Sequence, residues 1–262
     1  SIYTLNLANP TLQGNYLYHT TVMMLIILGG IGFAVLSNLS GIKFRYLNRR
    51  GLKLKLMINT KIVLFSTAFL ILAGTILIFI FEPFNFNDTL SFGEKIYQSL
   101  FLSVTSRTAG FNISPVSTLA PVTIVLLLPF MWIGASPGGT GGGIKTTTIS
   151  IAILTLLNLM RGKNKLELFD REISQNSIQK AFIVIMASLI FMCISVVLLI
   201  WAEPDKQPLN LIFEAVSAIS TVGLSLDLTS QLGTGGKMII IALMFIGRIG
   251  VLTFFLAFIR DS

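Results

Sequence analysis

The chain has 262 residues, of which 53% are hydrophobic and only 11% are charged. A soluble domain of this size carries about a quarter charged residues, and the apolar residues here lie in long blocks, so an ordinary soluble domain is excluded and an integral membrane protein is indicated. The formal net charge is +8, but the basic residues gather in alternate loops, which favours a membrane-topology signal over a nucleic-acid interface.

The hydropathy pattern predicts an all-α membrane protein with five crossing segments. A crossing needs about 20 apolar residues. The first candidate has no basic region before it and no small-residue cleavage site after it, so we do not expect a signal peptide. The third is long and interrupted. The candidates are residues 16–39, 57–81, 116–159, 178–202 and 237–259.

Two amphipathic segments, 91–105 and 209–219, are too short to cross. A helix of 15 residues extends about 22 Å, whereas the hydrocarbon core is about 30 Å thick. We therefore expect each to enter the membrane part-way and turn back as a half-helix.

The charged residues predict the orientation, because basic loops stay in the cytoplasm. Acidic residues mark the alternate loops. This pattern places the amino end outside the cell and the carboxyl end in the cytoplasm, in the plasma membrane. The basic loops also face anionic membrane lipid, and we expect no nucleic-acid partner. The basic residues are Lys43, Arg45, Arg49, Arg50, Lys53, Lys55 and Lys61 in one loop and Arg161, Lys163, Lys165, Arg171 and Lys180 in another; the acidic ones are Glu82, Asp88, Glu94, Glu203, Asp205 and Asp227.

An internal repeat is the strongest functional signal. The sequences Thr108-Ala-Gly-Phe-Asn and Thr221-Val-Gly-Leu-Ser each follow a half-helix. Each half-helix is preceded by an apolar segment that ends in an acid, Glu82 or Glu203, and is followed by an apolar segment with a glycine break. Glycine allows the backbone angles that turn carbonyl oxygens to one side, and such oxygens replace the hydration shell of a cation. One Thr-x-Gly is a weak signal, but two in register predict ion conduction, with a filter lined by the backbone of Thr108, Ala109, Gly110, Phe111, Thr221, Val222, Gly223 and Leu224.

The three inward segments share a glycine-bearing centre, which supports three related units, the first of them incomplete. The chain is therefore expected to be a fragment that starts within a repeat. The predicted parts are 1–40, an external loop and inward helix that end one repeat; 41–56, a basic cytoplasmic loop; 57–160, a repeat with filter loop and broken inward helix; 161–177, a cytoplasmic loop; and 178–262, a last repeat with filter loop and inward helix.

A glycine-rich run, 134–143, interrupts the third inward segment. Each glycine costs a helix about 1 kcal/mol and Pro137 about 3 kcal/mol. Backbone freed at membrane depth is tolerated where it lines a cavity, so we expect a gating loop below the filter. A phosphate-binding loop is disfavoured, because Ile144 separates Gly143 from Lys145 and no strand precedes. The predicted gate comprises Gly138, Gly139, Thr140, Gly141, Gly142, Gly143, Lys145 and Arg248.

Four charged residues and a glycine cluster are interpreted further. Arg248 in an apolar segment costs about 2.5–3.5 kcal/mol on insertion scales; it either ties the glycine-loop carbonyls or forms a barrier to cations, and the two roles are compatible. Lys145 either has these same roles, holding carbonyls or opposing cations, or is a solvated residue at the edge of the loop. Arg107 is expected to brace the first filter loop, and Glu214 to brace the second rather than to attract cations. The glycines 29, 30 and 32 are interpreted as close helix packing.

An enzyme needs acids, histidines or a nucleophile clustered at membrane depth. The only histidine, His19, is placed at a membrane edge, and the lone Cys193 gives no metal-ligand spacing. We therefore expect no enzyme and no cofactor in this subunit. A membrane enzyme or scaffold stays a distant alternative.

The sequence resembles the Trk/Ktr/HKT superfamily of potassium transporters, and most of all its bacterial Ktr-type membrane subunit. The resemblance runs along essentially the whole chain and rests on Ser106-Arg-Thr-Ala-Gly-Phe-Asn, Gly138-Gly-Thr-Gly-Gly-Gly-Ile-Lys-Thr-Thr and Gly247-Arg-Ile-Gly. It implies four helix–pore-helix–helix repeats around one pore, of which this chain holds about two and a half, with Gly110 and Gly223 among four filter glycines that bind potassium.

The resemblance also implies that the glycine run is an intramembrane gating loop with Arg248 near it. It implies a homodimer seated on a cytosolic ring of nucleotide-binding regulatory subunits, with potassium as substrate and sodium as a possible co-ion. A proton-coupled Trk-type transporter with a similar pore is the nearest alternative.

Overall fold

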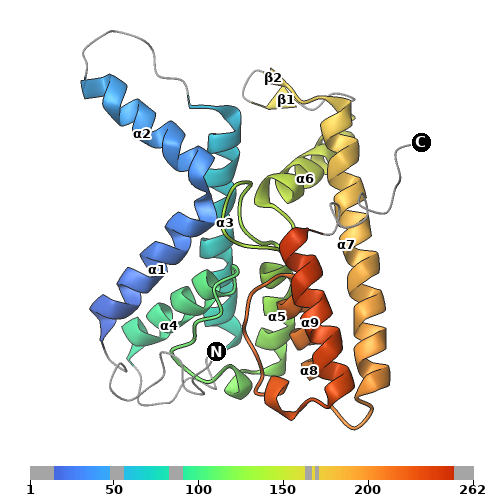
Figure 1. Ribbon diagram of the computed structural model, residues 1–262. Coiled ribbons are helices and arrows are strands. Elements are labelled where there is room, and N and C mark those ends of the chain that lie inside the picture. The colour runs from blue at the N-terminus through green and yellow to red at the C-terminus, as the bar shows by residue number, and fades with distance from the viewer. Residues whose placement is uncertain (1–14, 48–55, 83–90, 163–166, 169–170, 251–262) are drawn as a thin grey trace.

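The computed structural model describes residues 15–47, 56–82, 91–162, 167–168 and 171–250. This part of the chain is almost entirely helical, as predicted, with one two-stranded hairpin (Figure 1). The elements are α1 (Tyr16–Ile31), α2 (Phe33–Leu47), α3 (Ile58–Phe81), α4 (Phe92–Thr105), η2 (Val116–Thr118), α5 (Pro121–Trp132), α6 (Thr146–Met160), β1 (Glu167–Leu168), β2 (Arg171–Glu172), α7 (Gln175–Ala202), α8 (Pro208–Ile219), η3 (Thr229–Gln231) and α9 (Thr234–Ile249).

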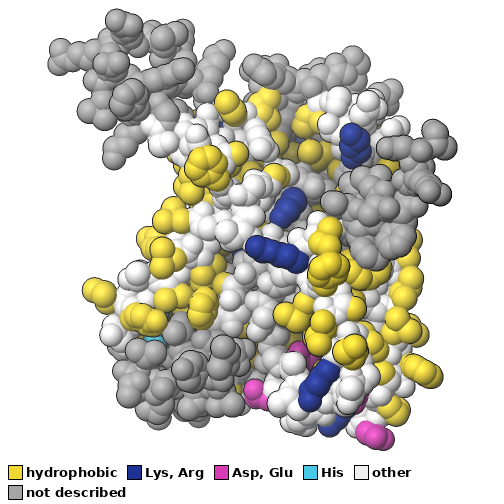
Figure 2. Space-filling view, viewed as in Figure 1, with side chains coloured by type: hydrophobic (Ala, Val, Ile, Leu, Met, Phe, Trp, Pro, Cys, Tyr) yellow, Lys and Arg dark blue, Asp and Glu magenta, His cyan; other side chains and the backbone are white. Residues whose placement is uncertain are grey.

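Within the described residues, α3 and α7 are long and apolar enough to cross a membrane unaided, with 24 and 28 residues. The half-helices α4 and α8 have 14 and 12 residues, fewer than the roughly 20 that a crossing needs. The prediction of two long crossings, each followed by a short half-helix, is confirmed for the helix lengths. Large apolar side chains such as Leu72 on α3 and Val197 on α7 stay exposed, and hydrophobic side chains run along both edges of the face drawn in Figure 2.

The predicted inward segment over 16–39 is not one straight helix but a bent pair of helices that is together long and apolar enough to cross a membrane. The chain bends by 95° between α1 and the start of α2. The bend lies at Gly32, whose φ of 89° is in the left-handed region that glycine tolerates and a helix does not use. A Cβ at this position would lie 2.8 Å from the carbonyl oxygen of Pro137, so the glycine loop packs directly on the bend.

The interpretation of Gly29 and Gly30 as helix-packing residues is also corrected. Their carbonyl oxygens accept hydrogen bonds from the backbone of the glycine loop, at 3.2 Å from Thr140 N and 2.9 Å from Ser136 N. A bent helix leaves carbonyls at its end without intrahelical partners. The loop satisfies these carbonyls, so the two glycines contact a loop rather than a helix.

The predicted break in the third inward segment is confirmed. α5 ends at Trp132 and α6 begins at Thr146. The two ends of the intervening loop are paired, because Ile144 N donates to Trp132 O and Gly134 N donates to Ile144 O, at 3.0 and 2.9 Å. The two ends of the loop thus lie side by side, and the loop is in the middle of the molecule, between the α1–α2 bend and α9 (Figure 1).

The predicted last crossing, 237–259, begins as a helix three residues earlier than expected, at Thr234 of α9. α9 ends at Ile249, before Gly250 with φ 94°. The rest of that prediction lies outside the described residues.

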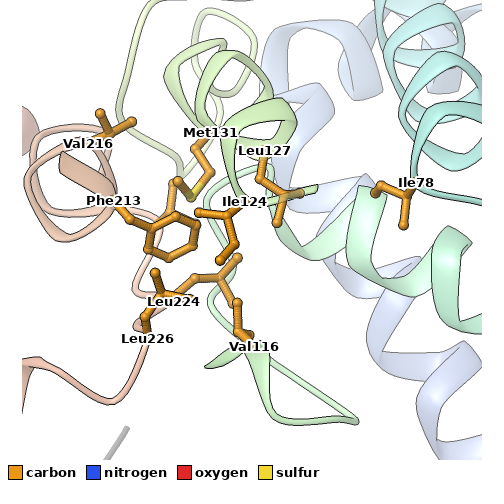
Figure 3. Close-up of a cluster of buried hydrophobic side chains, with 10 residues drawn as sticks. Ile78, Val116, Ile124, Leu127, Met131, Phe213, Val216, Leu224 and Leu226 are labelled. Carbon is orange, nitrogen blue, oxygen red and sulfur yellow. The ribbon is translucent and has the colours of Figure 1, made fainter. Parts of the chain in front are cut away.

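The largest buried cluster joins the two repeats. Ile124, Leu127 and Met131 of α5 pack with Phe213 and Val216 of α8 (Figure 3). Leu224 and Leu226, from the loop after α8, lie in the same cluster. α5 is therefore the apolar wall against which the second half-helix and its loop are positioned.

A candidate ion-conduction site

Both Thr-x-Gly motifs follow their half-helices as loops with the same backbone. Thr108 and Gly110 have φ of 64° and 73°, and Thr221 and Gly223 have φ of 55° and 87°. A β-branched residue with positive φ is a genuine outlier that costs on the order of 1–3 kcal/mol. Among the non-glycine residues that the structure describes, only these two threonines and Asp227 have positive φ. Positive φ thus occurs at matching Thr and Gly positions of both loops, so the predicted equivalence of the two motifs extends to the backbone.

A hydroxyl at the end of each half-helix braces its loop. Thr105 Oγ1 donates to Phe111 O at 2.5 Å, and Ser217 Oγ donates to Leu224 O at 2.6 Å. The fourth carbonyl of each predicted filter segment is therefore held by the protein and keeps only its second lone pair for a cation.

The two loops touch each other at their glycines. A Cβ on Gly110 would lie 2.5 Å from Val222 O and 3.1 Å from Gly223 Cα, whereas a Cβ on Gly223 would have Gly110 Cα at 3.7 Å as its nearest atom. Gly110 is thus required by both its φ and its neighbours, and Gly223 by its φ.

The glycine loop lies against both motif threonines. A Cβ on Gly141 would overlap the Thr108 side chain, and one on Gly142 would overlap that of Thr221. Gly142 N also donates to Thr221 Oγ1 at 2.9 Å. A displacement of the glycine loop would therefore change its contacts with Thr108 and Thr221, the first residues of the two motifs.

Two basic side chains hold consecutive carbonyls of the glycine loop. Arg248 Nη1 donates to Thr140 O at 2.5 Å, and Lys145 Nζ donates to Gly141 O at 2.7 Å. The structure brings these residues together as the sequence predicted, with Arg248 in the last turn of α9 and Lys145 directly before α6. Gly247 allows the close approach, because a Cβ there would overlap the backbone of Ile219 at the end of α8.

Glu214 braces the second loop, as the sequence indicated. Its buried carboxylate accepts hydrogen bonds from the hydroxyls of Ser225 and Thr229, the latter at 2.8 Å, and from Leu226 N at 3.3 Å. The loop after α8 is thus tied back to the half-helix that precedes it.

The expected bracing by Arg107 is not found for two of its nitrogens. The residue is 7% exposed, yet Nε and Nη2 have no acceptor among the described residues. The residue lines a cavity between α1 and the first loop.

Two glutamates have a structural role that the sequence analysis did not predict, and we call them the carboxylate clamps. Both oxygens of Glu82, at the end of α3, accept from Ala120 N at 3.0 and 3.2 Å, and one also accepts from the Thr123 hydroxyl. In the second repeat, Glu203 at the end of α7 accepts from Gly233 N at 2.6 Å. Each acid thus caps the start of the returning helix, where the helix dipole favours negative charge. The repetition of Glu-Pro after both crossings is the signal that could have revealed them.

A contact between the repeats was also missed. Ser117 Oγ of η2 donates to Asp227 Oδ2 at 2.6 Å. The two residues are 110 positions apart in the chain, so no local pattern predicts the pair.

In the part of the chain that the structure describes, no three His, Cys, Asp or Glu side chains come together as a possible metal site. The site thus consists of two loops with braced carbonyls that pack against a glycine loop, and backbone carbonyls are the kind of oxygen that can replace the hydration shell of a cation.

The arrangement of crossing helix, half-helix, loop and returning helix defines the chain as an all-α membrane protein built from repeats. Residues 11–262 match the family model of TrkH, described as a cation transport protein. The chain belongs to this family.

Known relatives and one solved structure are similar over most of the chain. It is 37% identical over 251 residues to Ktr system potassium uptake protein B of Bacillus subtilis, covering 95% of the chain and 54% of that protein. It is 34% identical over 245 residues to the potassium/sodium uptake protein NtpJ of Enterococcus hirae, covering 92% and 52%. The potassium transporter TrkH from Vibrio parahaemolyticus has the same fold, with a TM-score of 0.76 at 17% identity over 98% of this chain and 55% of that one. The chain spans about half the length of these relatives.

Proposed function

We propose that this chain forms part of the pore of a potassium uptake transporter in the plasma membrane. The observation that carries the proposal is the pair of braced loops, with left-handed Thr and Gly at matching positions. Family membership and the potassium uptake named for the similar relatives support it. The filter is the backbone of Thr108–Phe111 and Thr221–Leu224, and potassium binds there as substrate.

The direct test is ion flux through the full-length protein reconstituted in vesicles. Rubidium is the tracer for potassium, and sodium is the competitor. We expect saturable rubidium influx that sodium inhibits only weakly. Sodium influx equal to rubidium influx would contradict the potassium filter. Acceleration of rubidium influx by sodium would favour a sodium-coupled protein, a possibility that the name of the NtpJ relative raises, and acceleration by an imposed proton gradient would favour the proton-coupled alternative.

We further propose that Gly138–Gly143 is the gate and that Arg248 and Lys145 are its latches. Support comes from the two consecutive carbonyls that these side chains hold and from the contact of the loop with Thr108 and Thr221. Each hydrogen bond to a charged donor contributes about 1.5–3 kcal/mol, enough to favour one loop position. Opening needs both bonds to break.

The gate is tested by comparing Arg248→Gln, Lys145→Gln and the double variant in vesicles. Both single variants are expected to raise rubidium flux several-fold, and the double variant more than either. Lys237→Gln, an exposed lysine in the first turn of α9, is the matched control and should leave flux unchanged. Equal amounts of protein in the vesicles with flux at or below the native rate in all latch variants would remove the gate from the proposal.

The remaining proposals concern assembly and orientation: a homodimer, a cytosolic nucleotide-binding ring as regulatory partner, contact of the basic loops with membrane lipid, and an outside amino end. Orientation is tested with Asn176→Cys and Ser230→Cys, two exposed positions at opposite ends of the described repeat, in a Cys193→Ser background. An impermeant thiol reagent applied from outside should label the cysteine at 230 and spare the one at 176. The reverse pattern would overturn the charge-based topology.

A further inference from the structure

Arg107 lies directly before the first predicted filter segment and is buried without adequate partners. Nε and Nη2 have less than 1 Å² of exposed surface each and no acceptor among the described residues. The residue lines a cavity of about 340 Å³, together with Val22 and Ile26 of α1, the glycines at 29 and 30, and Thr140 of the glycine loop. A guanidinium cannot lose its proton in a protein. Its burial without a counter-charge carries a large free-energy cost.

The described carboxylates do not supply the missing acceptor. Glu82 and Glu203 cap returning helices, and Glu214 braces the second loop. Glu94 and Asp227 accept hydrogen bonds from Tyr16 and Ser117. Asp205 is exposed in the turn after α7. The charge of Arg107 is therefore unbalanced by the acids whose side chains the structure describes.

The other repeat places a neutral residue at the matching position. Ser220 directly precedes Thr221, as Arg107 precedes Thr108. It is fully buried, and its hydroxyl lacks a partner among the described residues. Only the first loop therefore needs a counter-charge. Arg107 lies beside the cavity that α1 lines, whereas Gly110 of the same loop contacts the second loop.

We infer that Arg107 pairs with a carboxylate carried by a membrane segment outside the described residues, packed into this cavity against α1 and the first loop. The planar guanidinium suits a bidentate pair with a carboxylate. The apolar wall of Val22, Leu25 and Ile26 suits a packed helix better than a hydrated free anion. The relatives are about twice as long as this chain, which leaves ample length for such a segment. The pair holds the first loop whether or not that loop selects potassium, so the inference does not rest on the proposed function.

The test uses the full-length protein in detergent, with the thermal midpoint read by fluorescence-detected size-exclusion chromatography and no transport assay. Arg107→Gln is combined with single Asp→Asn and Glu→Gln changes across the predicted membrane segments beyond this chain, and with Asp88→Asn. For one carboxylate, the effects on the thermal midpoint are expected to be non-additive with Arg107→Gln. Neutralising this carboxylate and Arg107→Gln each lower the midpoint by about 3 °C or more, and the midpoint of the double variant is no lower than that of either single variant. Ser220→Ala, the matched control, should show additive shifts with the same acid.

A charge swap covers the case in which single variants do not fold. Arg107→Glu combined with partner acid→Arg should recover at least half of the lost midpoint or yield. Four outcomes would overturn the inference. Arg107→Gln could leave the midpoint unchanged, coupling could fall on Asp88, no acid could couple or rescue, or the midpoint of the native protein could drop when chloride is replaced by gluconate, which would identify a free anion as the acceptor.

Discussion

The two repeats reach the same backbone with different support. In both, the motif threonine and glycine adopt positive φ, a half-helix hydroxyl holds the fourth carbonyl, and a glutamate caps the returning helix. The second loop is additionally held by the Glu214 network, whereas the first carries Arg107 without a described partner. The backbone geometry of the two loops is thus repeated, while the contacts that hold each loop differ. Variants that affect the two repeats differently therefore report on these contacts as well as on the backbone that the loops share.

The largest expected difference lies between Gly110→Ala and Gly223→Ala. Either change strains the backbone, because positive φ costs an L-residue about 1–2 kcal/mol. At Gly110 the new methyl also meets Val222 O at 2.5 Å, whereas at Gly223 the nearest atom is 3.7 Å away. Overpacking adds about 1–3 kcal/mol, so Gly110→Ala should lower rubidium uptake at least about tenfold more than Gly223→Ala, which should fold and lose discrimination against sodium.

Uptake is measured in potassium-limited cells with sodium as competitor, and membrane yield is measured beside it. Gly93→Ala is the control, because a Cβ there meets no atom within 4 Å. Equal losses at Gly110 and Gly223 would show that backbone strain alone, not contact between the loops, limits both positions.

Hydropathy and turn residues predicted the elements of this site well, because they depend on local chemistry. Runs of apolar residues located α3 and α7, and the cost of consecutive glycines located the break between α5 and α6. The bend at Gly32 was not predictable, since a glycine cluster in an apolar segment fits helix packing and helix breaking equally well. What decides is the glycine loop more than a hundred residues away, whose backbone bonds to Gly29 and Gly30.

Hydrogen bonds between residues far apart in the chain were also not predictable from the sequence. Glu82 and Glu203 were interpreted only as acids that end an apolar segment and mark the alternate loops. Their capping partners lie at the start of a different helix, beyond a half-helix and a loop. Arg107 was expected to brace the first loop because it directly precedes the motif threonine, although the sequence could not show which acceptor would face it.

An intermediate difference is expected between the two carboxylate clamps. Glu82 is 1% exposed and takes donors from Ala120 and Thr123, whereas Glu203 is only partly buried and takes Gly233 N. Leaving a buried donor without its charged acceptor costs about 1–3 kcal/mol, so Glu82→Gln should lower the thermal midpoint clearly. Glu203→Gln loses an interaction with a helix end worth about 0.3–1 kcal/mol. Asp205→Asn, exposed and close in sequence to Glu203, is the control, and a larger shift for Glu203→Gln than for Glu82→Gln would reverse the proposed ranking.

The smallest expected effect concerns how the half-helices begin. α4 starts with a capping box, in which Ser91 Oγ accepts from Glu94 N and Glu94 Oε2 accepts from Ser91 N, at 3.4 and 2.8 Å. α8 has no side-chain cap and starts with Pro208, whose fixed φ suits the first helical position. Ser91→Ala should therefore destabilise α4 by about 1 kcal/mol, while Gln207→Ala, at the cap position of α8, should change little.

The capping box also makes the start of α4 sensitive to pH. The hydrogen bond from the backbone N–H of Ser91, followed by that from the Tyr16 hydroxyl, holds the pKa of Glu94 below its ordinary value. A lowered carboxylate pKa contributes stability that is present above the unfolded value of about 4.3 and is lost as the pH falls through the folded value. Hydrogen-exchange protection of the first-turn amides of α4, taken relative to the intrinsic exchange rate at each pH, should accordingly fall below pH of about 4 in the native protein, and the Ser91→Ala variant should be less protected already at neutral pH. The first turn of α8, whose cap residue carries no titrating group, should keep its exchange rate ratio between native and Ser91→Ala protein close to one. A matching acceleration in α8 would mean that the half-helices open together, and that the two repeats are coupled more tightly than their separate supports imply.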